Sequence, residues 1–480
     1  MAKKPATKAT SKSRTRAKVP AAKSAAASRV RIRMYRLGVG DCFLVSFPRA
    51  GKEDYRILID CGVHQAQKGG NDRLKEVAKD LLAVTKGKID VAVGTHEHQD
   101  HLSGFPGILA EFKENSADVI WVAWTEDSND AFAKSLSDKK DQALTALSSA
   151  RMRMNLAGSS DEAAKLTSLL GFFGDGSGPK LKSFGNALKA LSTTIKYHTP
   201  GEPPIELEDH GVQARVFVLG PPRDTKLLGQ SAPSTKDDDQ VYKFGQAYKF
   251  GAYAALLGQL EPALGREPMG PFDDRFALPL DGTKAVSFFK QHYWADTNDE
   301  NLQDRIDNTQ DWRRIDADWM TSATTLALKL DEDTNNTSLV LAFELGPKDK
   351  DGPVLLFAAD AQVGNWLSWQ GLKWEYAGRT ITGPDLLKRT MIYKVGHHAS
   401  HNATLKKLGL ELMTSLELAL IPTDAEMAKA VKWGTLPWPP LLKELDDKAK
   451  HGAIRTDQPI GAKSSGLKVV QNDLYYEVEI

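Results

Sequence analysis

Residues 89–101 read IDVAVGTHEHQDH, an apolar run followed at once by three histidines and an aspartate. The apolar run 89–95 predicts a buried strand, and loops at strand ends are where α/β proteins gather ligand groups. In an extended segment residues i and i+2 point the same way, so His96 and His98 can bind one ion. Asp100 and His101 then lie within reach of a second ion. Imidazole and carboxylate ligands suit zinc, manganese or iron.

A second histidine cluster follows another apolar run near the C-terminus. Residues 391–395 predict a strand, and His397, His398 and His401 come directly after it. Between the two clusters, Asp360 ends the predicted strand 354–359, where its carboxylate could bridge two ions. The alternative is that the histidine clusters are polar loops that bind no metal. The first cluster, with three histidines and an aspartate within six residues, argues against this alternative.

Apolar and alternating runs predict further strands that alternate with helical segments. The predicted strands are 31–37, 42–47, 56–60, 119–124, 212–219, 338–343 and 474–480, with helices over 74–84 and 440–450 and mainly helical structure over 128–195. This alternation implies an α/β sandwich. Residues 224–334 break the pattern with many Gly, Pro and Asp residues, and we interpret them as an insertion.

Several short segments resemble one known family. They are MYRLGVGDC (34–42), NNTSL (335–339), LLFAAD (355–360), KVGHHAS (394–400) and GAIRTD (452–457). Together with the first histidine cluster, they resemble the soluble hydrolase domain of the ComEC competence family, in the metallo-β-lactamase superfamily. The resemblance covers about 29–110 and 335–480. It implies an αββα sandwich over 29–480, with the insertion 224–334 between its halves and without the family's membrane channel.

The resemblance also implies a metal centre that holds two divalent ions, Zn²⁺ or Mn²⁺. A centre with a single ion is the alternative. The implied ligands are His96, His98, Asp100, His101, Asp360 and His398. Asp360 would bridge the ions, which would share a hydroxide that attacks the substrate. Asp100 and His397 are the implied catalytic residues. The order of His397 and His398 is open, and we favour His398 as the ligand and His397 as a substrate contact.

The sequence departs from the superfamily at the third histidine of the first metal. His198 and His210 lie in the relevant region without the expected neighbours, and we expect both to be surface residues. Glu202 takes the histidine's place in the superfamily's Pro-Gly-His pattern. The first site is therefore in question: the centre could hold one ion, or water could fill the missing position. Trp366 and Trp369 are the tryptophans best placed to line a cleft, although packing is the commoner role.

Charge is unevenly distributed along the 480 residues. The whole chain carries 63 basic and 62 acidic residues, but residues 1–28 hold eight basic residues and no acid. The remainder has 55 basic against 62 acidic residues, a net charge of −7. Residues 1–28 are expected to be a disordered basic tail, either binding a nucleic-acid backbone or having no partner.

The two cysteines and the absence of a run of roughly 20 apolar residues predict a cytoplasmic protein without a membrane partner. The oligomeric state is not indicated. The predicted function is metal-dependent hydrolysis of phosphodiester bonds, as a nuclease or phosphoesterase. One alternative is hydrolysis of a small ester, lactone or amide on the same metals, and another is a non-catalytic binding or regulatory protein with a degenerate site.

Overall fold

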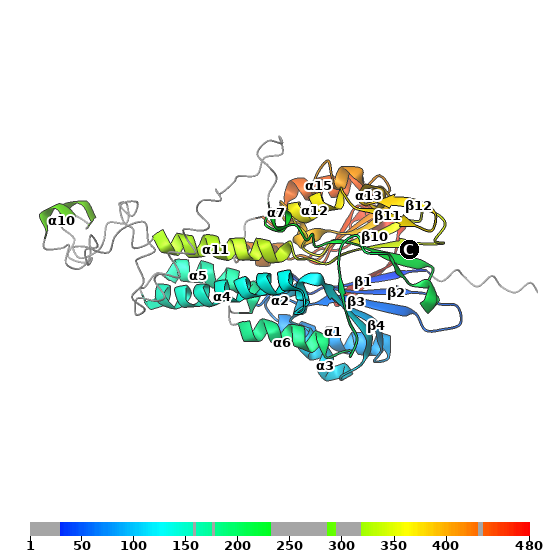
Figure 1. Ribbon diagram of the computed structural model, residues 1–480, viewed down its shortest axis with the longest axis horizontal. Helices are drawn as coiled ribbons and strands as arrows, with labels where there is room; N and C mark the ends of the chain where they lie inside the picture. The colour runs from blue at the N-terminus through cyan, green and yellow to red at the C-terminus, as the bar shows by residue number, and fades with distance from the viewer. Residues whose placement is uncertain (1–28, 157–159, 175–177, 232–285, 294–317, 431–434) are drawn as a thin grey trace, which may run out of the picture.

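The computed structural model describes residues 29–156, 160–174, 178–231, 286–293, 318–430 and 435–480. Across these residues two mixed β-sheets face each other and helices cover their outer surfaces, which confirms the α/β class (Figure 1). The predicted tail 1–28 and most of the predicted insertion 224–334 lie outside the described residues. No helix within the described ranges is long and apolar enough to cross a membrane.

The first sheet has eight strands and joins the two ends of the described chain. In pairing order its strands are β16 (Lys468–Gln471), β17 (Tyr475–Glu479), β1 (Arg31–Tyr35), β2 (Cys42–Phe47), β3 (Tyr55–Cys61), β4 (Ile89–Gly94), β5 (Ala117–Ala123) and β6 (Ile195–His198). Strands β3 to β6 run parallel, so their carboxyl ends meet at one edge of the sheet.

The second sheet has seven strands, of which the four on one side again run parallel. In pairing order they are β15 (Ala453–Arg455), β14 (Leu418–Ile421), β13 (Thr390–Lys394), β10 (Val354–Phe357), β9 (Val340–Leu345), β8 (Ala214–Gly220) and β7 (Ile205–Glu206). A separate hairpin pairs β11 (Lys373–Tyr376) with β12 (Arg379–Thr382). Strands β10, β13 and β14 are parallel, which brings the segments after β10 and β13 to one end of the sheet.

The two sheets pack through one apolar layer. Phe357 of β10 lies edge-on to Phe43 of β2 and to Phe343 of β9, with ring centroids 5.6 and 5.7 Å apart. On β4, Val91 and Val93 face this layer, while Ile89 and Ala92 belong to the core beneath the helices. Burial on both faces explains why the run before the first histidine cluster is mainly apolar and, apart from Asp90, does not alternate with polar residues.

Helices cover the outer face of each sheet. Those that pack on the first sheet are α1 (Gly70–Thr85), α3 (Phe105–Phe112) and α6 (Gly178–Lys189). Those on the second are α12 (Val363–Trp369), α13 (Gly383–Lys388) and α15 (Pro439–Lys448). Trp366 and Trp369 of α12 are fully buried in this second helical layer, so they have the commoner role of packing residues and do not line a cleft.

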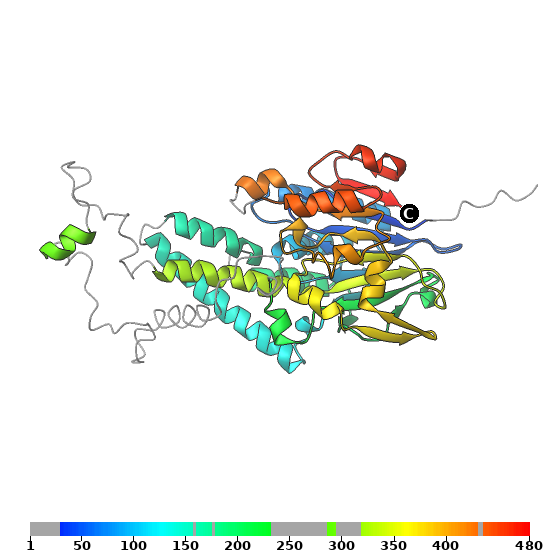
Figure 2. The same cartoon turned by 90° about the horizontal axis from the view of Figure 1, so that it is seen from above.

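Three further helices project from one end of the sandwich (Figures 1 and 2). They are α4 (Ala131–Leu156), α5 (Ser160–Leu170) and α11 (Asp318–Asn335), and the short turn η2 (Gly171–Phe173) follows α5. Leu147, Leu166 and Ala327 meet in their common core. We call α4, α5, η2 and α11 the helical lobe. Its last helix is built from the end of the predicted insertion, which thus packs against the segment predicted to be helical.

The remaining α-helices of the described residues are short: α2 (Gln99–Leu102), α7 (Thr225–Leu228), α10 (Ser287–Tyr293) and α14 (Ala425–Ala430). Every predicted strand is present with ends shifted by at most a few residues. The strands that prediction missed are short, and β6 falls at the end of a segment predicted to be helical.

Candidate metal centre

The predicted site residues lie where strands of both sheets end. His96 follows β4 of the first sheet, and Asp360 and His398 follow β10 and β13 of the second. The backbone N–H of Leu339 donates to the Thr95 carbonyl at 2.9 Å, which joins the two sheets at this end. Residues far apart in sequence thereby converge beside the helical lobe.

Four predicted ligands form one buried group: Asp100, His101, Asp360 and His398 each offer one ligand atom, and all four atoms lie within 4.8 Å of one another. His398 Nε2 is 3.0 Å from Asp100 Oδ2, and His101 Nε2 is 3.3 Å from Asp360 Oδ2. Two ligand atoms bound tetrahedrally to zinc at its usual bond lengths lie roughly 3.3 Å apart. The separations therefore suit a single divalent ion.

The two histidines of this group are held through their outer nitrogens. His101 Nδ1 is 2.8 Å from Asp60 Oδ2, and His398 Nδ1 is 2.9 Å from the carbonyl oxygen of Pro422. Each contact leaves Nε2 facing the group, as expected of metal-binding histidines. Asp60 is itself fixed by the backbone N–H of Thr95, which donates to Oδ1 at 2.8 Å. Prediction missed Asp60, although it closes the predicted strand 56–60 before the first cluster.

Lys394 orients Asp360 from the other side. Its ammonium group is buried, pairs with Asp41, donates to the Ala359 carbonyl at 2.9 Å and lies 3.6 Å from Asp360 Oδ1. The backbone N–H of His397 also donates to Asp360 Oδ1, at 3.1 Å. With Oδ1 engaged, Oδ2 is the oxygen of Asp360 that faces His101 and His398. Asp41, Asp60 and His101 form a second group of possible metal ligands. The Lys394 ammonium already pairs with Asp41 and so supplies positive charge to this group.

The charges of the four-residue group depend on one another. Burial alone would raise the pKa of Asp360, but His101 and His398 lower it well below its usual range. Burial alone would likewise lower the pKa of His101, but Asp360, Asp60 and Asp41 raise it well above its usual range. In the metal-free protein, protonated histidines thus supply positive charge. A divalent ion would take over that role and displace the protons.

The predicted ligands His96 and His98 lie outside the four-residue group and form a pair of their own. His96 Nε2 and His98 Nδ1 are 3.2 Å apart, a separation that suits two ligands of one ion. His96 Nδ1 lies 3.1 Å from the Thr95 hydroxyl and 3.3 Å from the Ser338 hydroxyl. Burial and the neighbouring histidine His101 lower the pKa of His96 well below its usual range, so it is neutral and able to bind metal.

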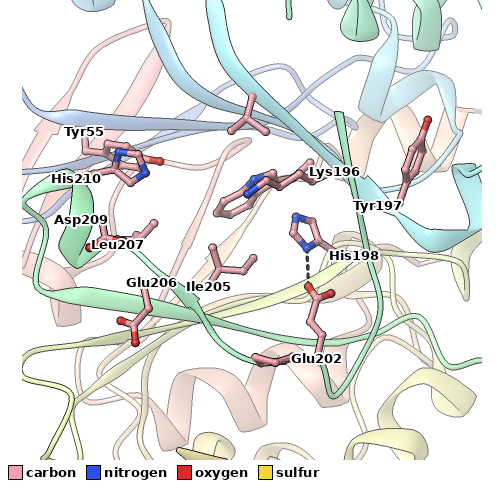
Figure 3. Close-up of a pocket in the computed structure, with 13 residues that line it drawn as sticks. Tyr55, Lys196, Tyr197, His198, Glu202, Ile205, Glu206, Leu207, Asp209 and His210 are labelled. Carbon is pink, nitrogen blue, oxygen red and sulfur yellow. Dashed lines mark hydrogen bonds and ion pairs between the residues drawn. The ribbon is translucent and has the colours of Figure 1, made fainter. Parts of the chain in front are cut away.

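The candidates for the missing third ligand lie elsewhere. Figure 3 shows His198 and Glu202 in a cavity of about 600 Å³ near Tyr55 and His210, and none of the six predicted ligands lines this cavity. His198 Nδ1 is 2.5 Å from Glu202 Oε1. His198 is 5% exposed, so the expectation of a surface residue is wrong for it, whereas His210 is exposed as predicted. Within the described residues, neither histidine belongs to a group that could hold a metal.

His397 occupies a different position from His398. It lies outside the four-residue group and is only half-buried, with Nδ1 2.8 Å from the Ser400 hydroxyl and Nε2 3.4 Å from Asn335 Nδ2. Burial lowers the pKa of His397 to about 4, so the imidazole is neutral at pH 7. His401 is exposed. The structure therefore joins His398 to the other ligands and leaves His397 at the edge of the centre.

A second cavity lies between the helical lobe and the sandwich. It has a volume of about 940 Å³ and is bordered by Glu97, which stands between His96 and His98, and by Thr337. Glu97 pairs with Lys140 of α4. The lining contains five lysines and five carboxylates, so it carries little net charge: Lys134, Lys139, Lys140, Lys189, Lys329, Glu97, Glu126, Asp127, Asp138 and Asp333.

Orphaned polar atoms indicate that the centre is built for ions. His101 Nε2 and Asp100 Oδ1 are buried without a hydrogen-bond partner among the described residues, a costly state unless an ion binds them. The residues present therefore fit a divalent metal. No model of a known protein family matches this chain, and no curated protein matches it either.

Proposed function

We propose that this chain is a metal-dependent hydrolase with the αββα sandwich of the metallo-β-lactamase superfamily. The observation that carries the proposal is the convergence of Asp100, His101, Asp360 and His398 within 4.8 Å at the ends of strands from both sheets. The face-to-face sheets with helices outside, and the predicted ligands at their shared end, support the same assignment.

The ligands divide between two ions. Asp100, His101, Asp360 and His398 would hold one, and His96 with His98 would hold the other. Divalent ions bound there would supply Lewis acidity, activating water and stabilising the negative charge that develops during hydrolysis. Asp60 and Lys394 fix the orientations of His101 and Asp360, so the ligand atoms are aligned before any ion binds.

His397 is the residue we assign to the substrate. It is neutral at pH 7, half-buried and adjacent to the ligand His398, so its ring is placed to contact a bound group. Its contacts with Ser400 and Asn335 hold the ring in place. Removing His397 should therefore slow turnover and leave metal content unchanged.

A phosphodiester is the first candidate substrate, because the ComEC-like group that the sequence resembles is associated with nuclease and phosphoesterase activity. The cavity beside Glu97 favours a second candidate, a small ester, lactone or amide. Its volume of about 940 Å³ is within the range of small-molecule sites, and its balanced charges give no continuous basic surface for a polyanion.

Metal analysis combined with hydrolysis assays tests this proposal. The purified chain should bind about two Zn²⁺ or Mn²⁺ ions and hydrolyse a bis-aryl phosphodiester, DNA or RNA. Turnover of a lactone with no phosphodiester cleaved would select the second candidate. A chain that binds no metal under any condition would instead support a non-catalytic binding or regulatory protein.

The basic tail provides a separate test of nucleic-acid binding. We propose that residues 1–28 contribute phosphate contacts, because they carry eight basic residues and no acid. Deleting them should weaken DNA or RNA binding and flatten its salt dependence, while turnover of a small substrate stays the same. Unchanged nucleic-acid affinity would remove the tail from the proposal.

A further inference from the structure

Three of the four histidines that would bind metal have their outer nitrogen paired with a protein group. Asp60 holds His101, the Pro422 carbonyl holds His398, and two hydroxyls lie beside His96 Nδ1. Such partners fix the tautomer of a metal-binding imidazole and raise its basicity. The fourth histidine, His98, should have a comparable partner.

The nearest candidate is a carboxylate of the helical lobe. His98 Nδ1 faces His96 Nε2, so its other nitrogen, Nε2, points away from the first ion's position. There it lies 3.7 Å from Asp331 Oδ1 on α11. His98 Nε2 and Asp331 Oδ1 are both buried without a hydrogen-bond partner in the described parts of the chain. A shift of about 0.8 Å would bring them to ordinary N–H···O distance.

Asp331 is held in a position that suits this role. Its Oδ2 accepts a hydrogen bond at 3.2 Å from Asn335 Nδ2, one turn later on α11. His98 also packs against η2, with its ring centroid 4.8 Å from that of Phe173. The helical lobe therefore contacts the His98 ring through an aromatic side chain and places a carboxylate near its Nε2.

We infer that Asp331 is a positioning residue of the first metal site: it accepts the Nε2–H of His98 and so presents Nδ1 to the ion. This inference rests on the proposed metal centre and adds that the helical lobe is required for binding of the first ion. Through Asn335, which contacts both Asp331 and His397, α11 also links the two histidine clusters.

Metal titration of the full-length chain tests the inference in Asp331→Ala and Asp331→Asn. Co²⁺, followed by its visible absorption, and Zn²⁺, followed by calorimetry, should each show two binding steps in the wild-type protein. We assign the weaker step to the site of His96 and His98 and the stronger step to the four-residue group. In Asp331→Ala the metal affinity of the weaker step should fall roughly 10- to 100-fold, and that of the stronger step should not change. Asp331→Asn should lose less, because its amide oxygen can still accept from His98. Asp333→Ala is the matched control, since Asp333 lies on the same helix and pairs with Lys329.

The tautomer of His98 provides a readout that needs no variant. In the wild-type chain loaded with Zn²⁺, nitrogen–proton correlation spectra should show His98 protonated on Nε2. Protonation on Nδ1, or a weaker binding step in Asp331→Ala equal to that of Asp333→Ala, would overturn the inference, as would a wild-type chain that binds one ion only. A wild-type chain that binds no ion would instead overturn the proposed function.

Discussion

Two buried carboxylate networks in this protein are neutralised in different ways. Glu344 of β9 is fully buried and is held by three guanidinium groups, those of Arg215, Arg379 and Arg389. Burial alone would raise the pKa of Glu344, but hydrogen bonds from the three arginines lower it to about 2. The three guanidinium groups therefore neutralise the buried Glu344 carboxylate without any further cation.

The network at the strand ends is different, because histidines supply part of its positive charge. Its buried acidic residues are Asp41, Asp60, Asp100, Asp331 and Asp360, and its cations are Lys394 and the two histidines whose pKa is raised, His101 and His398. Among the described residues, His101 Nε2 and Asp100 Oδ1 have no hydrogen-bond partner, whereas both oxygens of Glu344 accept hydrogen bonds. The two networks therefore differ in how fully their polar atoms are paired, and the proposed metal centre lies in the less fully paired one.

The largest effect is expected from removing the charge of the proposed bridge. Asp360→Asn should lower hydrolysis roughly 10³-fold or more, because metal stabilisation of developing charge is worth several kcal/mol. It should also reduce the number of bound ions, measured by elemental analysis. Asp351→Asn, at a side chain 68% exposed, is the control. Full metal content and activity in Asp360→Asn would show that the strand-end network needs no external cation.

Glu344→Gln tests the network in which three arginines neutralise a buried carboxylate. The folded-state pKa of about 2 lies below the ordinary value of 4.5, so the stabilisation is fully present above pH 4.5 and is lost as the pH falls toward 2. The variant should lose about 3 kcal/mol of unfolding free energy at pH 7. This difference should shrink by about half or more at pH 3, as measured by denaturant unfolding.

Metal should not change the loss caused by Glu344→Gln, since no ion is expected near the arginines. Glu375→Gln is a suitable control, because the Glu375 side chain is 67% exposed. A pH-independent difference between Glu344→Gln and the wild-type chain would mean that the ionised carboxylate does not supply the stabilisation.

The smallest effect is expected from a carboxylate that only orients a ligand. Asp60→Asn keeps the shape of the side chain but weakens the contact to His101 Nδ1. Metal affinity should fall roughly 10- to 100-fold while saturating metal restores most activity. Calorimetric titration with Zn²⁺ measures the affinity. Loss of activity that saturating metal does not restore would place Asp60 in the reaction itself.

Local patterns were sufficient to predict the strands that carry the centre. The apolar runs 89–95, 354–359 and 391–395 correspond to β4, β10 and β13, because strands buried on both faces need continuous apolar sequence. The His and Asp residues that follow them lie together in the structure. Asp60 and Lys394 were missed as contacts because each resembles an ordinary strand residue, and only the pairing of strands brings them to His101 and Asp360.

The sequence by itself determined the α/β class and the positions of the histidine clusters, since both follow from short-range periodicity. Only the tertiary structure decided that His398 and not His397 joins Asp100, His101 and Asp360, because the chain turns sharply here, through three positive-φ residues in succession with φ of 45°, 51° and 63°. It also decided that Asp331 lies beside His98. That contact depends on how α11 packs with α4 and α5, and packing between distant helices leaves no periodic pattern in the segment around Asp331.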